Sequence, residues 1–64
     1  MIHKNKLKDL IIERLEMPVY KFCKEIGVSR PTIDNILNKN EFNPSLMTVK
    51  KICKYFDVDF KEYL

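Results

Sequence analysis

The sequence predicts an all-α fold of five short helices. Apolar residues recur at helical spacing along nearly the whole chain, and no segment alternates as a strand does. One glycine and three prolines in 64 residues are too few for a fold rich in strands and turns. Apolar (45%) and charged (33%) fractions near globular averages argue against disorder. We therefore expect a single small domain over residues 1–64.

The first two helices follow from one apolar stripe and one proline. The stripe has the spacing i, i+3, i+4, i+8: Leu7, Leu10, Ile11 and Leu15. It predicts a helix over about 5–16, which ends before Pro18 because a proline disfavours helical backbone in the preceding residue. Pro18 can open a second helix, and Gly27 ends it as a left-handed cap. Four residues form the inner face of that helix: Val19, Phe22, Cys23 and Ile26.

The third helix begins at Ser29, whose hydroxyl can cap the N–H groups of the first turn. Its inner side consists of three residues: Ile33, Ile36 and Leu37. It ends at Asn38–Asn40, where asparagine can adopt the left-handed conformation. A polar loop follows, in which we expect Phe42 to point inward.

The fourth helix starts around Pro44–Ser45, and five of its residues are expected to be buried: Leu46, Val49, Ile52, Cys53 and Phe56. The spacing of Asp59 and Glu62 is that of a capping box with aspartate in place of serine or threonine. It predicts a fifth helix of one or two turns that ends at Leu64.

Residue usage excludes several functions. Cys23 and Cys53 are 30 positions apart with no CxxC pair, and His3 is the only histidine, so we expect buried thiols, no metal site and no cofactor. The sequence shows no Ser/His/Asp or Cys/His arrangement, no glycine-rich phosphate loop and no paired carboxylates, so we expect no enzyme. No apolar run approaches the roughly 20 residues of a membrane span, which predicts a cytoplasmic protein.

The charge is unevenly distributed. The net charge is +3, but residues 1–54 carry 11 Lys/Arg and 6 Asp/Glu, whereas the last ten carry 1 and 3. A basic body with an acidic end suits an anionic partner that contacts one face.

The second and third helices are joined by about three residues that include the only glycine. Such a short connection makes two helices meet at a steep angle, as in a helix-turn-helix. The unit, over about 19–38, needs a small residue where the helices cross (Cys23) and a glycine in the turn (Gly27). Its interior is filled by Phe22, Ile26, Val28, Ile33 and Ile36.

The sequence resembles the Cro and lambda-repressor type of helix-turn-helix DNA-binding domain, the xenobiotic-response-element (XRE) family. The matching segments are Phe22–Ile33, Asn43–Leu46 and Tyr55–Asp59, and the resemblance covers about residues 5–64. It implies a lambda-repressor-like five-helix bundle whose third helix enters the major groove of DNA, usually as a dimer.

The outer side of the third helix carries polar residues suited to base edges. At 100° per residue, Pro31, Asn35 and Asn38 point away from the core, and Arg30, Thr32 and Asp34 lie on the flanks. Arginine pairs with guanine, asparagine pairs with adenine, and a carboxylate accepts from the cytosine amino group. We expect five residues to contact bases: Arg30, Pro31, Thr32, Asn35 and Asn38. A plainer interpretation, that these are solvated residues on an ordinary helix, stays open.

Two further groups complete the expected sites. Residues beside the recognition helix are candidates for DNA backbone contacts: Ser29, Tyr20, Lys21, Lys39, Asn40 and Asn43. A late apolar group is the candidate dimer interface: Phe60, Tyr63 and Leu64. A homodimer would bind a near-palindromic operator.

These observations predict a sequence-specific double-stranded DNA-binding transcriptional regulator, in the simplest case a Cro-like repressor that is nucleoid-associated when bound. The length leaves no room for a small-molecule effector domain, and no membrane partner is expected. The alternative is a protein-interaction module, antitoxin-like or adaptor-like, in which a protein partner occupies a face of the same bundle.

Overall fold

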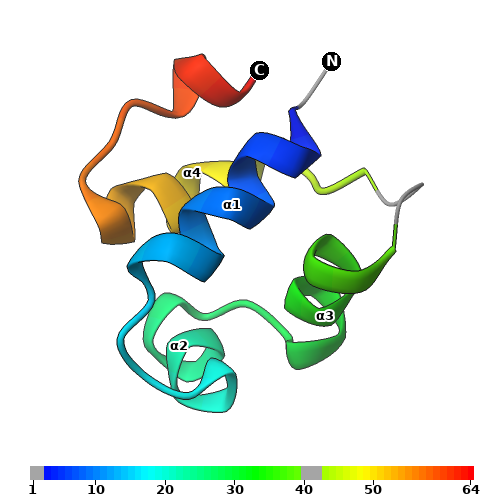
Figure 1. Cartoon of the computed structure of the whole chain (residues 1–64), viewed down its shortest axis with the longest axis vertical. Helices are drawn as coiled ribbons and strands as arrows, with labels where there is room; N and C mark the ends of the chain where they lie inside the picture. Colours follow the sequence, from blue (N-terminus) through cyan, green and yellow to red (C-terminus); the bar gives the residue numbers. More distant parts are fainter. Residues whose placement is uncertain (1–2, 40–42) are drawn as a thin grey trace.

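The computed structural model, which describes residues 3–39 and 43–64, confirms the all-α fold (Figure 1). The described residues form four α-helices and no strand: α1 (Lys4–Arg14), α2 (Val19–Ile26), α3 (Arg30–Asn38) and α4 (Leu46–Phe56). The last element is a four-residue 3₁₀ helix, η1 (Phe60–Tyr63), so the predicted fifth helix is a single tight turn.

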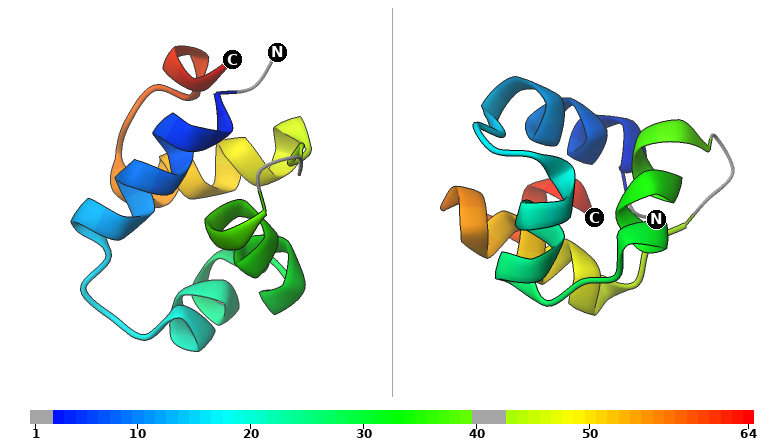
Figure 2. Two further views of the ribbon diagram at one scale, coloured as in Figure 1. Left: turned by 45° about the vertical axis from the view of Figure 1, so that its right-hand side comes forward. Right: turned by 90° about the horizontal axis from the view of Figure 1, so that it is seen from below.

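The helices surround one core. Helix α1 packs on α3 and η1, α2 packs on α3 and α4, and α4 packs on η1. In Figure 1, α2 and α3 form the lower end of the molecule and η1 lies at the opposite end. The left view of Figure 2 shows the same order after a 45° turn. Every element contributes to the core, which consists of Leu7, Leu10, Ile11, Phe22, Cys23, Ile33, Ile36, Val49, Ile52, Cys53 and Tyr63.

The boundaries of α1 and α2 follow local backbone preferences. Helix α1 ends at Arg14 rather than near residue 16, because Leu15 is already extended (φ −73°, ψ 123°) while it still packs against the core. Pro18 is the N-cap of α2, and its carbonyl accepts from the amides of Lys21 and Phe22, each at 3.1 Å. Gly27 adopts the predicted left-handed conformation (φ 70°, ψ 36°).

The prediction that the Ser29 hydroxyl caps an amide of α3 is wrong. Ser29 occupies the N-cap position, but its Oγ lies 2.8 Å from Oγ1 of Thr32 and accepts no amide. Ser45 is the serine that caps in the expected way, since its Oγ accepts from the amide of Thr48 at 3.2 Å. Helix α3 ends through an extended Lys39 (φ −110°, ψ 127°), not through a left-handed Asn38. The predictions for Asn40 and Phe42 lie outside the described residues.

Helix α4 buries a different first turn from the one predicted. Leu46 is 45% exposed, whereas Thr48 is buried beside Val49. Around the axis of α4, Leu46 lies about 90° from the centre of the stripe of buried residues, and therefore at the edge of that stripe. Thr48 can face the core because the Ser45 and Thr48 hydroxyls lie 3.0 Å apart, so the Thr48 hydroxyl has a hydrogen-bond partner.

At the end of the chain, the Asp59 carboxylate accepts from the amide of Lys61 at 3.0 Å. Asp59 therefore caps a 3₁₀ turn rather than forming the predicted capping box with Glu62.

Candidate nucleic-acid interface

The connection between α2 and α3 is closed by hydrogen bonds around Gly27. The amide of Val28 donates to the carbonyl of Cys23 at 3.1 Å, which satisfies the last turn of α2. A Cβ at position 27 would meet only Nζ of Lys51, at 3.9 Å, so the positive φ rather than lack of space requires glycine. Nζ of Lys51 also donates to the Gly27 carbonyl at 3.3 Å and thereby ties α4 to the turn.

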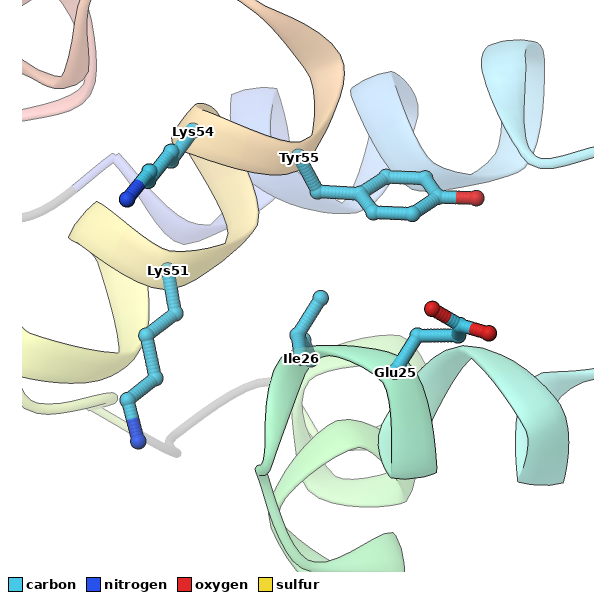
Figure 3. Close-up of a pocket in the computed structure, with 5 residues that line it drawn as sticks. All are labelled: Glu25, Ile26, Lys51, Lys54 and Tyr55. Atoms are coloured by element: carbon cyan, nitrogen blue, oxygen red, sulfur yellow. The ribbon is translucent and has the colours of Figure 1, made fainter.

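Aromatic rings hold α2 against α4. The ring of Phe22 lies 5.1 Å from that of Tyr55, edge-on, and 5.6 Å from that of Phe56. Below Tyr55 lies an open cavity of about 410 Å³ between the two helices, lined by Glu25, Ile26, Lys51, Lys54 and Tyr55. Figure 3 shows the Tyr55 ring of α4 extending above Ile26 and Glu25 of α2. Lys51 lies on the side of Ile26 that is away from Glu25. The packing fixes the orientation of α2, on which α3 in turn packs.

The outer face of α3 carries the five predicted base-contacting residues. Ile33 and Ile36 are completely buried and set the inner side of the helix. Arg30, Pro31 and Asn38 are exposed, with Arg30 on a flank, and two residues are half-buried: Thr32 and Asn35. The structure therefore brings the whole group to one helix, with its longest cationic side chain in the first turn.

Arg30 makes an ion pair that was not anticipated from the sequence. Its Nε donates to Oδ1 of Asp34 at 3.0 Å, and the two side chains are 54% and 45% exposed. The signal was present in the sequence, because oppositely charged residues four apart on a helix are neighbours. The leading base-reading candidate is thus held by a partner on its own helix.

The predicted backbone-contacting residues lie on both sides of α3. Tyr20 and Lys21 are exposed in the first turn of α2, where they line an open hollow with Lys24 and Glu25. Ser29 lies at the start of α3, whereas Lys39 and Asn43 are exposed beyond its end. Asn40 lies outside the described residues. Lys24 was not among the predicted residues, although its cationic side chain lies one turn after Lys21.

The predicted dimer interface is only partly at the surface. Tyr63 is 6% exposed and belongs to the core. Its carbonyl accepts from the His3 amide at 2.7 Å, and Nζ of Lys6 lies 5.0 Å from the centre of its ring. Burial raises the pKa of the Tyr63 hydroxyl. Phe60 is half-buried with Nζ of Lys50 over its ring, and Leu64 is 42% exposed. Leu64 therefore offers the largest exposed fraction of the three.

Neither cysteine joins a reactive cluster. Cys23 and Cys53 are free and buried, and burial raises the pKa of both thiols. Within residues 3–39 and 43–64, no three His, Cys, Asp or Glu side chains come together as a metal site would require. In the same part of the chain, none of the helices is long and apolar enough to cross a bilayer.

Comparison with known proteins identifies the fold family. The helix-turn-helix family model matches residues 7–63, which is most of the chain and includes the whole unit from α2 to α3. Neither curated proteins nor solved structures give a match. Helix-turn-helix domains of this kind are DNA-binding regulatory domains and not typically enzymes. The chain belongs to the helix-turn-helix family, of the Cro and lambda-repressor (XRE) type, and is a DNA-binding regulator.

Proposed function

We propose that the chain is a sequence-specific double-stranded DNA-binding transcriptional regulator, a Cro-like repressor, that reads the major groove with α3. One observation carries the proposal: the helix after the Gly27 turn buries Ile33 and Ile36 completely and presents an arginine, a proline and asparagines on its outer face. An α-helix fits the major groove, where each base pair presents a distinct pattern of donors and acceptors.

The base contacts follow from the chemistry of the exposed groups. Arg30 donates two hydrogen bonds to guanine O6 and N7, and Asn35 pairs with adenine one turn further along. Pro31, which has no donor, packs on a thymine methyl group. Thr32 and Asn38 contact the flanking bases.

Contacts to the DNA backbone fix the register of α3 without reading sequence. The proposed set surrounds the helix: Ser29, Tyr20, Lys21, Lys39, Asn40 and Asn43. Lys21 and Lys39 are both exposed, one in α2 and the other directly after α3, so each can bind a phosphate from a different element. These contacts give binding its salt dependence.

A homodimer completes the proposal. Helix η1, which contains Phe60 and Tyr63 and is followed by Leu64, lies at the end of the molecule opposite α2 and α3 (Figure 1). Pairing there through the exposed parts of Phe60 and Leu64 leaves both recognition helices uncovered. Two recognition helices about 34–36 Å apart predict a near-palindromic operator. Repression then follows from occlusion of a promoter by the bound dimer, in the cytoplasm and at the nucleoid.

The test is selection from a random double-stranded DNA pool with the purified protein at about 150 mM salt. Enrichment of a two-fold symmetric motif is the expected result, and it supplies the operator. Enrichment of a single half-site would retain sequence-specific binding and remove the dimer. Binding that disappears as salt rises, with no enriched motif, would reject the proposal and favour the protein-interaction module, in which Leu64→Ser rather than Arg30→Ala abolishes function.

A further inference from the structure

We propose that Asp34 determines specificity by holding the Arg30 guanidinium in the orientation that reads guanine. The inference rests on the proposed function, because it concerns the same face of α3. It assigns to the DNA-facing helix a carboxylate whose role is to position the arginine and to reject unsuitable DNA, and it does not require Asp34 itself to touch a base.

The geometry leaves the reading end of the arginine available. Asp34 Oδ1 accepts from Nε of Arg30 at 3.0 Å. Among the residues that the structure describes, neither Nη group of Arg30 has a hydrogen-bond partner. A guanidinium donates from a rigid planar fork, so a bond at Nε fixes the plane in which the two Nη groups point. Those two groups form the end-on pair that matches O6 and N7 of guanine.

Stability does not account for this pair. Both side chains are about half exposed, and an exposed ion pair four residues apart on a helix contributes little to folding. Its consequence for binding is larger, since an arginine side chain has many rotamers and loses them when it docks on a base. Where a neighbouring carboxylate already restricts those rotamers, part of that entropy is lost before DNA binds.

The charge of Asp34 has a second effect. Positioning Arg30 strengthens binding to the cognate site, whereas the negative charge weakens binding to DNA in general. A carboxylate on the helix that faces DNA is repelled by phosphates, so it weakens binding to every sequence. Only a site where Arg30 finds its guanine compensates for that repulsion. Asp34 therefore lowers nonspecific affinity while it sharpens preference at one base pair, which is how a repulsive element contributes to specificity.

The two effects make Asp34→Asn informative. We expect the preference for guanine over the other bases at the Arg30 position to fall by about two- to tenfold. We expect affinity for random duplex DNA to rise by about two- to fivefold. Binding is measured by fluorescence anisotropy at about 150 mM salt, on the selected operator, on operators substituted at that base pair and on random DNA.

Four further variants support the test. Asp34→Glu retains a carboxylate that can reach Arg30 across one helical turn, so base preference should be kept. Glu16→Gln removes one negative charge from an exposed position between α1 and α2, and it should leave base preference unchanged. Arg30→Ala should abolish the preference at that base pair, and adding Asp34→Asn to Arg30→Ala should change the preference no further. Circular dichroism should show that all variants remain folded, because every changed position lies outside the core.

The outcomes separate this inference from the proposed function. If Asp34→Asn tightens binding to operator and random DNA equally and leaves base preference intact, Asp34 is only a repelling charge and the inference is overturned. If Arg30→Ala leaves base preference unchanged, the inference is also overturned, while an enriched motif still supports a sequence-specific regulator. If the wild-type protein enriches no motif, the proposed function fails before any variant is made, and the inference fails with it.

Discussion

Helices α2 and α4 end in the same way, yet the next segments of the chain differ. Each helix ends in a left-handed residue, Gly27 (φ 70°) after α2 and Asp57 (φ 56°) after α4. In both turns the next residue is a valine whose amide donates to the carbonyl of a buried cysteine: Val28 to Cys23 at 3.1 Å, and Val58 to Cys53 at 3.0 Å. The same turn thus occurs twice in one small domain.

The two turns lead into helices of different length. Ser29 leads into the nine residues of α3, where Ile33 and Ile36 are completely buried. Asp59 leads into four residues of 3₁₀ helix, where only Tyr63 is buried. A turn therefore sets the change of direction, whereas repeated burial at helical spacing decides whether a full helix forms.

The charges of the two turns differ as well. Nζ of Lys51 donates to the carbonyl of Gly27, and Arg30 follows closely in the sequence, so two cationic residues lie near the first turn. The second turn carries Asp57 and Asp59, which would repel phosphates. Of two turns with similar backbones, only the first suits a polyanion.

The largest expected effect comes from the aromatic cluster that connects the two turns. Phe22 precedes Cys23 of the first turn, and its ring contacts Tyr55 and Phe56 just before the second. We expect Phe22→Ala to lower the free energy of unfolding by about 3–5 kcal/mol in urea denaturation. Ile52→Val, at the equivalent position before Cys53, should lower it by only about 0.5–1.5 kcal/mol. Equal losses would mean that the rings do not connect the turns.

The second prediction compares the segment after the first turn with the segment after the second turn by their effect on DNA affinity. Arg30→Ala should weaken operator binding by about 1–3 kcal/mol and relax preference at one base pair. Lys39→Ala should weaken binding to all sequences alike and reduce the salt slope by about one. Lys61→Ala, after the second turn, should change neither. If Arg30→Ala and Lys39→Ala weaken operator and random DNA equally, α3 is not the recognition helix.

Features decided by nearby residues could be predicted from the sequence. The stripe from Leu7 to Ile11 and the left-handed Gly27 follow from spacing and from backbone sterics alone. The outer face of α3 followed in the same way once Ile33 and Ile36 were placed inward. Thr32 and Asn35 on this face are half-buried. A helical wheel gives the direction of a side chain but not the fraction of it that neighbouring elements cover.

Features that depend on which of several possible partners a side chain contacts could not be predicted from the sequence. The Ser29 hydroxyl has two possible partners, an amide and Thr32, and takes the second. Tyr63 packs into the core and contacts His3 and Lys6, about 60 positions earlier, and no local pattern indicates such contacts. The DNA and dimer contacts depend on molecules outside the chain, and they stay predictions.

The third prediction tests whether the first turn needs glycine for its backbone. Gly27→Ala should lower the free energy of unfolding by about 1–2 kcal/mol, because an alanine Cβ disfavours the left-handed conformation. Gly27→Asn should cost less, since asparagine tolerates that conformation, as Asp57 does in the second turn. Urea denaturation measures both. An equal cost for the two variants would point to the surroundings of position 27 rather than to φ.

The fourth prediction concerns the charge of the second turn. Asp57 places a carboxylate at the C-terminal end of α4, where the helix dipole is negative. Asp57→Asn keeps the left-handed conformation accessible and removes the charge, so we expect a gain of about 0.3–1 kcal/mol in the free energy of unfolding. The gain should shrink in high salt, because exposed charges are screened. A gain that persists at about 1 M salt would contradict the electrostatic explanation.

The smallest effect separates the two cysteines. Burial raises the pKa of both thiols. At Cys23 the Arg30 guanidinium lowers the pKa and the Asp34 carboxylate raises it, whereas at Cys53 both neighbouring charges, Asp59 and Glu62, raise it. A thiol whose pKa is raised by folding keeps its proton in the folded state after the unfolded chain has lost it. The free energy of unfolding is therefore highest below the unfolded-state pKa of the thiols and falls as pH rises through their folded-state pKa.

Urea denaturation at about pH 8 and about pH 10 measures this fall in the wild type, Cys23→Ala and Cys53→Ala. All other ionisable groups are common to the three proteins, so only the difference between the proteins reports on the thiols. We expect Cys53→Ala to remove more of the pH dependence than Cys23→Ala does. The opposite order would mean that the neighbouring charges do not set the difference between the two thiols, and it would weaken the contrast between a cationic first turn and an acidic second turn.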